Sequence, residues 1–396
     1  MSSSQDKFSV GVVGLGTMGS GIAQLAATHG HQVLMYDAFD VMRTKAKGLI
    51  DKNLAKLKER GKLSEKEAST IASRLKVIDS LLPLAECNVV IEAVSEDLEI
   101  KRKLFAELDT ITPETTLLCT NTSSLSVSAV VSNCRHRGRM LGLHFFNPAQ
   151  VMPLVEIVPT AVTALPALLR AKTAVESWGK VAVVAQDTPG FIVNRIARPF
   201  YGEALRIHEE NIADIATIDW AMKEIGGFRM GPFELMDFIG NDINLKVSES
   251  VFTAFYYEPR FRPSLLQRRM VDSGFLGRKV GRGFYDYSPG VEPPKPNEDQ
   301  KLGETIFNRI ISMLINEAAD ALYMGVASRE DIDLAMEKGV NYPKGLLGWA
   351  DELGVKTVLS NITSLNAHYE EDRYRPCPLL KTLAREGRSF FDKKLG

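Results

Sequence analysis

The feature that most constrains the fold is a glycine motif that directly follows a short apolar run. Phe8–Val13 is apolar and valine-rich, as buried strands are, and Gly14, Gly16 and Gly19 then form G-x-G-x-x-G. Glycines at this spacing permit a tight turn, a close backbone approach to a pyrophosphate and close helix–strand packing. A helical pattern follows up to Gly30, and the N–H groups at its start suit a phosphate. We therefore expect a dinucleotide loop made of Gly14, Gly16, Thr17, Met18 and Gly19.

An acidic residue at the end of the next predicted strand bears on which dinucleotide is bound. The stretch HQVLMYD ends in Asp37, 18 residues after Gly19. A carboxylate at this place accepts hydrogen bonds from the adenosine ribose and repels a 2′-phosphate, which favours NAD over NADP. Arg43 lies nearby and keeps NADP open. A glycine-rich turn without a ligand is the alternative, but strand, helix, second strand and terminal acid all follow in the expected order.

The composition is that of an ordinary soluble globular protein. The 396 residues allow two or three domains, and a formal net charge of −1 argues against nucleic acid as the main partner. The opening MSSSQDK lacks the pattern of a signal peptide, and no apolar run is long enough to span a membrane. We therefore expect a cytoplasmic protein without a membrane partner. No paired spacing that would indicate a disulfide framework or a zinc site is found among Cys87, Cys119, Cys134 and Cys377.

Two charged, amphipathic helices are predicted after Asp37, over Val41–Arg60 and Ser64–Leu75. Together they are longer than a crossover between two strands needs. Their basic side chains either meet the phosphates of a nucleotide-bearing substrate or form a solvated surface without a ligand, and the charge pattern leaves both open. These side chains are Lys52, Lys56, Lys58 and Arg60.

Two further predicted strands end in polar residues. Asn88–Val94 has the pattern of a buried strand with Glu92 near its carboxyl end, and the next strand runs into the cluster Asn121–Ser124. Ligands of open α/β sheets bind at the carboxyl ends of the strands. These hydroxyls therefore either contact a ligand or cap the following helix.

The stretch LHFFNPAQVMPLVEI carries a histidine at the end of one apolar run and a glutamate inside the next. Asn147-Pro148 supplies the turn, and His144 and Glu156 lie within hydrogen-bond reach if the two strands are neighbours. A buried glutamate is costly unless it is paired. A histidine in an apolar run is usually a core residue, but oxidation of an alcohol beside a dinucleotide needs a base. We therefore favour a proton-transfer pair, in which the carboxylate holds the imidazole.

These residues resemble the L-3-hydroxyacyl-CoA dehydrogenases, NAD enzymes of β-oxidation and related acyl-CoA metabolism. The resemblance is greatest to the bacterial branch that acts on 3-hydroxybutyryl-CoA or 3-hydroxyadipyl-CoA. The matching stretches span Val10 to Tyr287 and are VGVVGLGTMGSGIA, VIEAVSEDLEIK, TNTSSLS, GLHFFNPAQVMPLVEIV, DTPGFIVNRI and GRKVGRGFYDY.

The resemblance implies a catalytic set. His144 would be the general base and Glu156 its partner. Ser123 and Asn194 would donate hydrogen bonds to the hydroxyl and the thioester carbonyl of the substrate, with Asn147 supporting the site.

The resemblance also implies a cofactor and a CoA site. Asp37, Glu92 and Asn121 would serve NAD together with the glycine loop. The pair of charged helices would receive the CoA portion, where this sequence offers Asn53 and Arg60.

The second half of the chain is predicted to be helical and to repeat itself. Thr188-Pro189 is a plausible helix start, with Asn194 in the first turns. NRI at 194–196 recurs at 308–310, and IDWAM at 218–222 recurs as IDLAM at 332–336, both at an offset of 114. Short members of the resembled family pair this helical domain across a dimer. The tandem copy is thus predicted to take the place of a partner subunit within one chain, although a homo-oligomer stays open.

The predicted fold class is therefore α/β, with a Rossmann-type domain followed by an all-α domain in two tandem copies. The second copy lacks the PGF ahead of Asn308 and a second His/Glu pair, so we expect it to be structural. The predicted parts are the NAD-binding domain over 1–187, the helical substrate domain over 188–287, a proline-rich linker over 288–300 and the second copy over 301–396.

The predicted function is NAD-dependent oxidation of an L-3-hydroxyacyl-CoA to the 3-ketoacyl-CoA, without a metal. One alternative is a dehydrogenase of a free hydroxy acid or sugar acid on the same fold, and another is a non-catalytic NAD-binding protein. The sequence does not determine the acyl chain. Arg198 or Arg229 would suit a terminal carboxylate on it, although a surface arginine without catalytic duty is the simpler interpretation.

Overall fold

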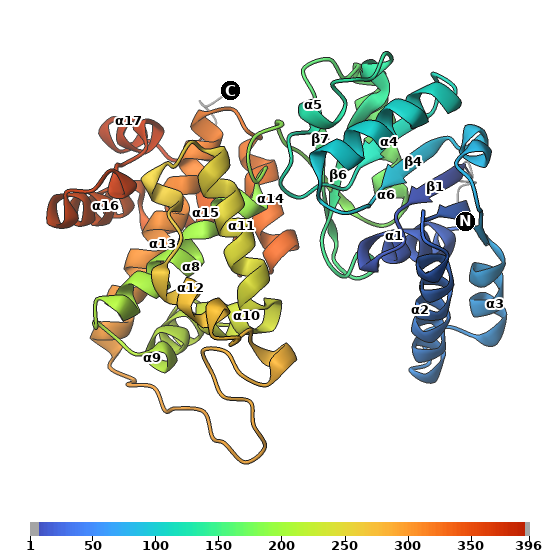
Figure 1. Cartoon of the computed structure of the whole chain (residues 1–396). Helices are drawn as coiled ribbons and strands as arrows, with labels where there is room; N and C mark the ends of the chain where they lie inside the picture. Colours follow the sequence, from blue (N-terminus) through green and yellow to red (C-terminus); the bar gives the residue numbers. More distant parts are fainter. Residues whose placement is uncertain (1–7, 393–396) are drawn as a thin grey trace. The chain divides into compact units, whose positions relative to one another are not determined.

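The computed structural model of the protein describes residues 8–392. The chain forms two compact units that divide after Thr188 (Figure 1). MSSSQDK, on which the expectation about a signal peptide rests, lies outside the described residues, as do residues 393–396 of the predicted second helical copy. Within residues 8–392, no helix combines the length and the apolar character needed to cross a membrane.

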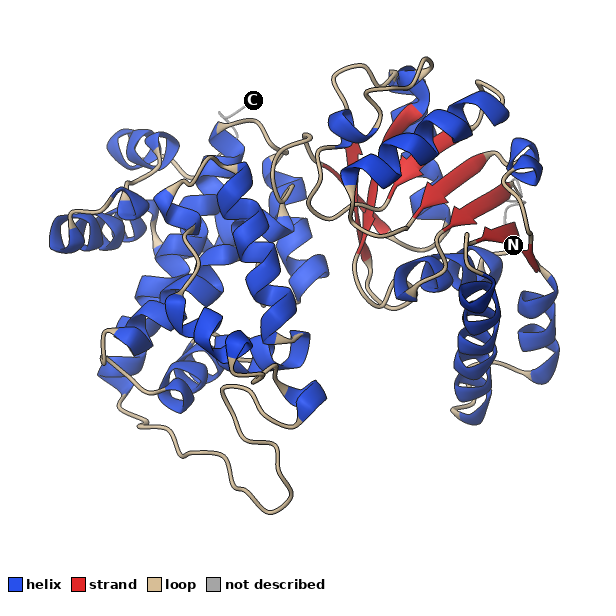
Figure 2. Cartoon of the chain, in the orientation of Figure 1, coloured by secondary structure: helices blue, strands red, loops and turns tan. Residues whose placement is uncertain are grey.

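The first unit is built on one eight-stranded sheet with helices on both faces (Figure 2). The strands lie in the order β3-β2-β1-β4-β5-β6-β7-β8, and every neighbouring pair is parallel except β6 and β7. The predicted strands ending near Asp37, Glu92, Asn121 and His144 are therefore parallel, and their carboxyl ends lie along one edge. The strands are β1 Ser9–Val13, β2 Gln32–Tyr36, β3 Leu75–Val77, β4 Val89–Glu92, β5 Leu117–Thr120, β6 Met140–Phe145, β7 Leu154–Pro159 and β8 Val181–Val184.

Two hydrophobic cores cover the two faces of this sheet. Successive strand residues point to opposite faces, so Val10 and Val12 pack on one side and Val13 on the other. The first core includes residues of α1, α2, α3 and α6, and the second includes residues of α4 and α5. The helices are α1 Thr17–Thr28, α2 Asp40–Glu59, α3 Glu65–Ser73, α4 Leu98–Ile111, α5 Val127–Val130 and α6 Leu165–Ser177, with short 3-10 turns at Leu82–Glu86 and Arg137–Arg139.

The second unit consists of helices and loops. Residues 288–299 form a long connection without helix or strand, visible below the helices in Figure 1. The helices are α7 Val193–Ile196, α8 Arg198–Glu209, α9 Ile215–Trp220, α10 Pro232–Ile239, α11 Asn241–Ala254, α12 Leu265–Asp272, α13 Gln300–Tyr323, α14 Arg329–Val340, α15 Leu346–Leu353, α16 Val355–Tyr369 and α17 Pro378–Glu386. Shorter helical turns lie at Ala221–Ile225, Pro259–Phe261, Arg278–Val280 and Asp372–Tyr374.

The predicted helix start at Thr188-Pro189 is wrong. Pro189 to Ile192 form turns, and the helix begins only at Val193. Gly190 has a φ of 74° and Phe191 a φ of 48°, both in the left-handed region, which a right-handed helix cannot include. The dipeptide Pro189-Gly190 is itself a turn signal and outweighs the preference of proline for a first helical turn.

Buried ion pairs join α7 and α8 to α13. Arg195 donates through Nε to Glu317 at 2.6 Å, and Arg309 donates through Nε to Glu203 at 2.9 Å. Arg260 adds a bond from Nη1 to the other oxygen of Glu317 at 2.9 Å. All five side chains are at most 7% exposed. Because an unpaired charge in such a place is costly, these contacts strongly constrain how the helices pack.

Replacing Glu317 by glutamine should destabilise the protein by about 3–5 kcal/mol, because two buried guanidinium groups lose the fully buried carboxylate that they share and keep only their contacts with Asp320. Urea unfolding followed by circular dichroism measures the change. Glu352→Gln is the matched control, because Glu352 and its partner Lys344 are 58% and 48% exposed, respectively. This variant should lower the free energy of unfolding by at most about 1 kcal/mol. Equal losses in the two variants would contradict the structural importance of the buried pair.

Candidate active site

The glycine loop joins β1 to α1 and leaves the start of the helix open. Gly14 has a φ of 91°, and a Cβ there would lie 2.6 Å from the backbone of Ala93 and Val94. Gly16 is the N-cap residue and supplies no side-chain cap, so the first N–H groups of α1 remain for a ligand. Thr17 is exposed and Met18 half-exposed. The open helix start leaves room for a pyrophosphate, and the contact of these residues with NAD stays a prediction.

Asp37 follows β2 and helps to hold the glycine loop. Its Oδ2 accepts a hydrogen bond from the Leu15 N–H at 2.7 Å, and its Oδ1 accepts one from the Phe39 N–H at 3.0 Å. Arg43, the residue that kept NADP open, donates to the Asp37 carbonyl at 2.5 Å and pairs with Asp40. Because its guanidinium already binds these protein oxygens, Arg43 is poorly placed to bind the 2′-phosphate of NADP, which favours NAD.

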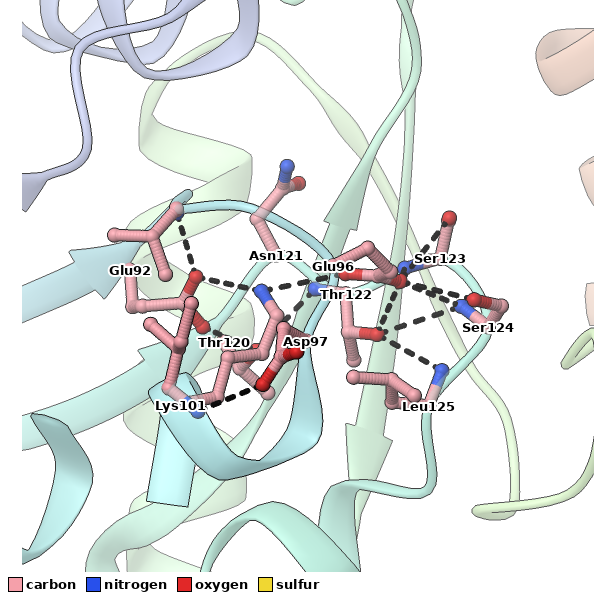
Figure 3. A network of polar contacts seen from close by, with 12 residues as sticks. Glu92, Glu96, Asp97, Lys101, Thr120, Asn121, Thr122, Ser123, Ser124 and Leu125 are labelled. Carbon is pink, nitrogen blue, oxygen red and sulfur yellow. Dashed lines mark hydrogen bonds and ion pairs between the residues drawn. The ribbon is translucent and has the colours of Figure 1, made fainter. Parts of the chain in front are cut away.

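A buried lysine links two glutamates beside the carboxyl ends of β4 and β5 (Figure 3). Lys101 on α4 is 1% exposed, and its Nζ lies 2.6 Å from Glu92 Oε1 and 3.3 Å from Glu96 Oε2. Glu92 also accepts hydrogen bonds from the Val94 N–H and the Thr120 hydroxyl, both at 2.7 Å. Glu92 is fully buried. Its direct contact with NAD stays a prediction.

Glu96 holds the predicted substrate residue Ser123. One oxygen, Oε1, accepts hydrogen bonds from the Ser123 N–H at 2.8 Å, the Ser123 hydroxyl at 3.3 Å and the Thr122 hydroxyl at 2.6 Å. Burial raises the pKa of Glu96, but Lys101 and these hydrogen bonds outweigh burial and hold that pKa below its usual value. An ionised Glu96 can only accept hydrogen bonds, so it orients the hydroxyls around it.

Sequence reasoning missed Glu96 and Lys101. Both lie in VIEAVSEDLEIK, and the signal was an acid directly after a strand end with a lysine in the first turns of the next helix. The alternative was that the hydroxyls of Asn121–Ser124 cap the next helix, but the residue that caps it is Ser126. Ser126 caps α5 by accepting a hydrogen bond from the Ala129 N–H at 3.3 Å, while Ser123 bonds to Glu96.

His144 and Glu156 are directly opposite each other on the antiparallel strands β6 and β7. The distance between His144 Nδ1 and Glu156 Oε2 is 2.6 Å. His144 is 6% exposed and Glu156 is fully buried. A carboxylate at this distance requires the proton on Nδ1, so neutral imidazole presents Nε2 as its basic nitrogen. The contact expected from the sequence is therefore present.

Asn121 ties the ends of β5 and β6 together. Its backbone N–H donates to the Glu92 carbonyl at 2.8 Å, and its Oδ1 accepts from the Phe145 N–H at 2.9 Å. Asn147 lies just after β6 and is exposed, in the turn before β7. The structure thus brings Glu92, Asn121, Ser123 and His144 to neighbouring strand ends.

The remaining predicted residues lie elsewhere. Asn53 on α2 donates from Nδ2 to Gln24 on α1 at 3.2 Å. Arg60 follows the end of α2 and is exposed, and Lys58 pairs with Glu65 at 2.7 Å. Asn194 lies on α7 in the second unit and is half-buried. The roles of these residues toward CoA and substrate stay predictions.

The cysteines and the acidic side chains show no metal or disulfide chemistry in the described part of the chain. All four cysteines are buried thiols. No group of three or more His, Cys, Asp or Glu side chains within residues 8–392 is arranged to hold a metal ion.

Two glycine variants should separate the demands of the fold from those of the ligand. A Cβ on Gly19 would lie 1.8 Å from the Gly14 carbonyl oxygen, whereas a Cβ on Gly16 would meet nothing within 4 Å. Gly19→Ala should therefore lower the thermal midpoint without any ligand. Gly16→Ala should leave the midpoint unchanged and weaken NADH binding, measured by fluorescence titration, because the added methyl blocks the close approach of the pyrophosphate. Normal NADH affinity in Gly16→Ala would contradict the predicted place of the phosphate.

Known proteins of one enzyme family match both units of the chain. Residues 9–188 match the family model of the 3-hydroxyacyl-CoA dehydrogenase NAD binding domain. Residues 190–287 and 306–393 both match the model of the C-terminal domain of the same family. The chain is 40% identical to 3-hydroxyadipyl-CoA dehydrogenase of Escherichia coli K12, over 95% of this chain and 97% of that protein.

A shorter relative and a solved structure are both 3-hydroxybutyryl-CoA dehydrogenases. The chain is 38% identical to 3-hydroxybutyryl-CoA dehydrogenase of Mycobacterium tuberculosis, over 70% of this chain and 98% of that protein. A crystal structure of 3-hydroxybutyryl-CoA dehydrogenase from Escherichia coli superimposes with a TM-score of 0.90 at 38% identity, covering 96% of this chain and 99% of that one.

Proposed function

The chain belongs to the 3-hydroxyacyl-CoA dehydrogenase family, and from this premise we propose which residues carry the reaction and which acyl groups it serves. The enzyme is an NAD-dependent oxidoreductase that oxidises an L-3-hydroxyacyl-CoA to the 3-ketoacyl-CoA. The acyl group is short, as in 3-hydroxybutyryl-CoA, or a six-carbon dicarboxylic chain, as in 3-hydroxyadipyl-CoA. We expect the enzyme to work in the cytoplasm, as its sequence predicts.

The observation that carries the proposal is the contact of 2.6 Å between His144 and Glu156. NAD, when bound, supplies the acceptor for the hydride that leaves the hydroxyl-bearing carbon. His144 takes the hydroxyl proton on Nε2, and Glu156 stabilises the imidazolium that forms. Ser123, held by Glu96, and Asn194 donate hydrogen bonds to the substrate oxygens. Hydride and proton both leave the substrate, so the alcohol becomes a ketone.

His144→Gln should lower kcat by about a hundredfold to ten-thousandfold, because the hydroxyl proton then has no base. NADH affinity should stay unchanged, since the glycine loop and Asp37 are intact. Steady-state assays with 3-hydroxybutyryl-CoA and NADH titration measure the two quantities. His368→Gln, which changes an exposed histidine of α16, is the control and should keep full activity. Full activity in His144→Gln would refute the assignment.

We also propose that the second unit holds two tandem copies of one helical module. Asp219 accepts hydrogen bonds from the N–H groups of Phe233 and Glu234, and Asp333 accepts them from Leu347 and Gly348, all at the offset of 114. The glycines that end the following helices, Gly240 and Gly354, both have positive φ, at 105° and 87°. The same local structure is therefore built twice.

The ion pairs between α7, α8 and α13 support an arrangement like that of two subunits. Arg195 and Glu203 of the first copy correspond to Arg309 and Glu317 of the second. Each arginine bonds the glutamate of the other copy, as a twofold axis would require. We infer that the second copy, over 301–396, takes the place of a partner of the substrate domain, over 188–287. The linker 288–300 connects them, and the NAD-binding domain covers 1–187.

If the tandem copy replaces a partner subunit, the full chain should be a monomer of 43.8 kDa. Sedimentation equilibrium over about a hundredfold range of concentration measures the mass. The physical reason is that the face of α8 that a second subunit would cover is already buried against α13. A dimer that persists at the lowest concentration would contradict this proposal, without affecting the assignment of His144.

A further inference from the structure

Arg198, at the start of α8, is a buried arginine without an acidic partner. It is 8% exposed. Its Nε donates to the Asn194 carbonyl at 2.9 Å, and its Nη1 donates to the Ser248 hydroxyl at 3.0 Å and toward the Asn244 carbonyl at 3.5 Å. Among residues 8–392 it forms no ion pair. The simpler interpretation from the sequence, a surface arginine, therefore does not apply to Arg198.

The other buried arginines of the second unit each contact a carboxylate. Arg195 pairs with Glu317, Arg260 with Glu317 and Arg309 with Glu203. Burial lowers the pKa of Arg198, whereas for Arg260 the nearby Glu317 outweighs burial and raises the pKa. A buried charge is costly unless it is paired, so a guanidinium in this position calls for an anion from outside the chain.

One nitrogen of Arg198 can reach such an anion. Nη2 donates to no described residue, whereas Nε and Nη1 are held by the Asn194 carbonyl and Ser248. The N–H groups of Nη2 therefore remain for a ligand. A planar guanidinium fixed in this way presents its remaining N–H groups in a defined direction, which suits a carboxylate.

The fold of the module does not need this polar group. At the offset of 114, the second copy has Ser312, Val358 and Ile362 in place of Arg198, Asn244 and Ser248. The corresponding helices α13 and α16 form with those residues. The arginine is thus present only in the copy that carries the predicted substrate residue.

Arg198 also lies close to Asn194 in the chain, since α7 and α8 are separated only by Ala197. The hydrogen bond from Arg198 Nε to the Asn194 carbonyl holds the two residues together. In a 3-hydroxyadipyl group, only a short methylene spacer separates the hydroxyl-bearing carbon from the terminal carboxylate. A substrate whose hydroxyl or thioester reaches Asn194 can therefore bring such a carboxylate toward Arg198.

We propose that Arg198 binds the terminal carboxylate of a dicarboxylic 3-hydroxyacyl-CoA and selects it over a neutral acyl chain of the same length. The inference rests on the proposed function and on the role of Asn194 in it. Of the two acyl groups in the proposed function, the short neutral chain and the six-carbon dicarboxylic chain, Arg198 favours the dicarboxylic one.

The test compares 3-hydroxyadipyl-CoA with 3-hydroxyhexanoyl-CoA, which has the same length and an uncharged end. The full-length enzyme should show a kcat/KM at least about tenfold higher for the adipyl substrate. Arg198→Met should lower kcat/KM for the adipyl substrate by about thirtyfold or more, because truncating one partner of a buried charge pair has effects of this size. It should leave the hexanoyl value within about threefold. Arg198→Lys keeps the charge without the planar fork, so its ratio should be intermediate.

Arg229→Met is the matched control, since Arg229 is exposed in the same unit, and its ratio of the two kcat/KM values should equal that of the unchanged enzyme. The proposal is overturned if Arg198→Met changes both substrates equally, which would indicate only a structural role. It is also overturned if the unchanged enzyme does not prefer the adipyl substrate, a result that needs no variant to fold. Failure to oxidise any 3-hydroxyacyl-CoA would instead refute the proposed function.

Discussion

The contact between His144 and Glu156 depends on one reversal of strand direction. Every other neighbouring pair in the sheet is parallel, and only β6 and β7 are antiparallel. In that pair the two residues are directly opposite, with side chains on the same face. A slip of the register by one residue would turn Glu156 to the other face and separate it from the imidazole. Both faces of β7 are buried, and Glu156 is the one charged residue of the strand, so the pairing with β6 must place it on the face of the imidazole.

The same edge of the sheet is organised by charges that have been removed from water. Lys101 and Glu92 are both at most 1% exposed, and loss of Lys101 would leave Glu92 without a cation in the core. Their pairing holds the first turn of α4, and with it Glu96, close to the strand ends. Glu96 then fixes the backbone and the hydroxyl of Ser123. A residue that is predicted to touch the substrate is thus positioned by a chain of contacts leading back into the core.

The sequence was sufficient for features that depend on local chemistry. The glycine motif, Asp37 at a strand end, and the His144–Glu156 pair follow from periodicity, turn residues and the cost of burying a carboxylate. The helix start after Thr188 was misplaced because two positive φ angles at Gly190 and Phe191 override a local preference. Glu96 and Lys101 were missed because their role depends on contacts with Ser123 and Glu92, which lie on other elements. The ion pair of Arg195 with Glu317 joins residues far apart in the chain, and no local pattern predicts it.

The proposed duplication of the helical module offers a comparison within one chain between what folding requires and what function adds. Arg195, Glu203, Asp219 and Gly240 all have counterparts at the offset of 114, and in both copies they hold helices together or end them. Asn194 has the counterpart Asn308, which is exposed, so its presence alone says little about catalysis. Arg198 has no such counterpart, and its polar neighbours are replaced by apolar residues. A costly buried charge that the second copy folds without is better explained by a ligand than by the fold.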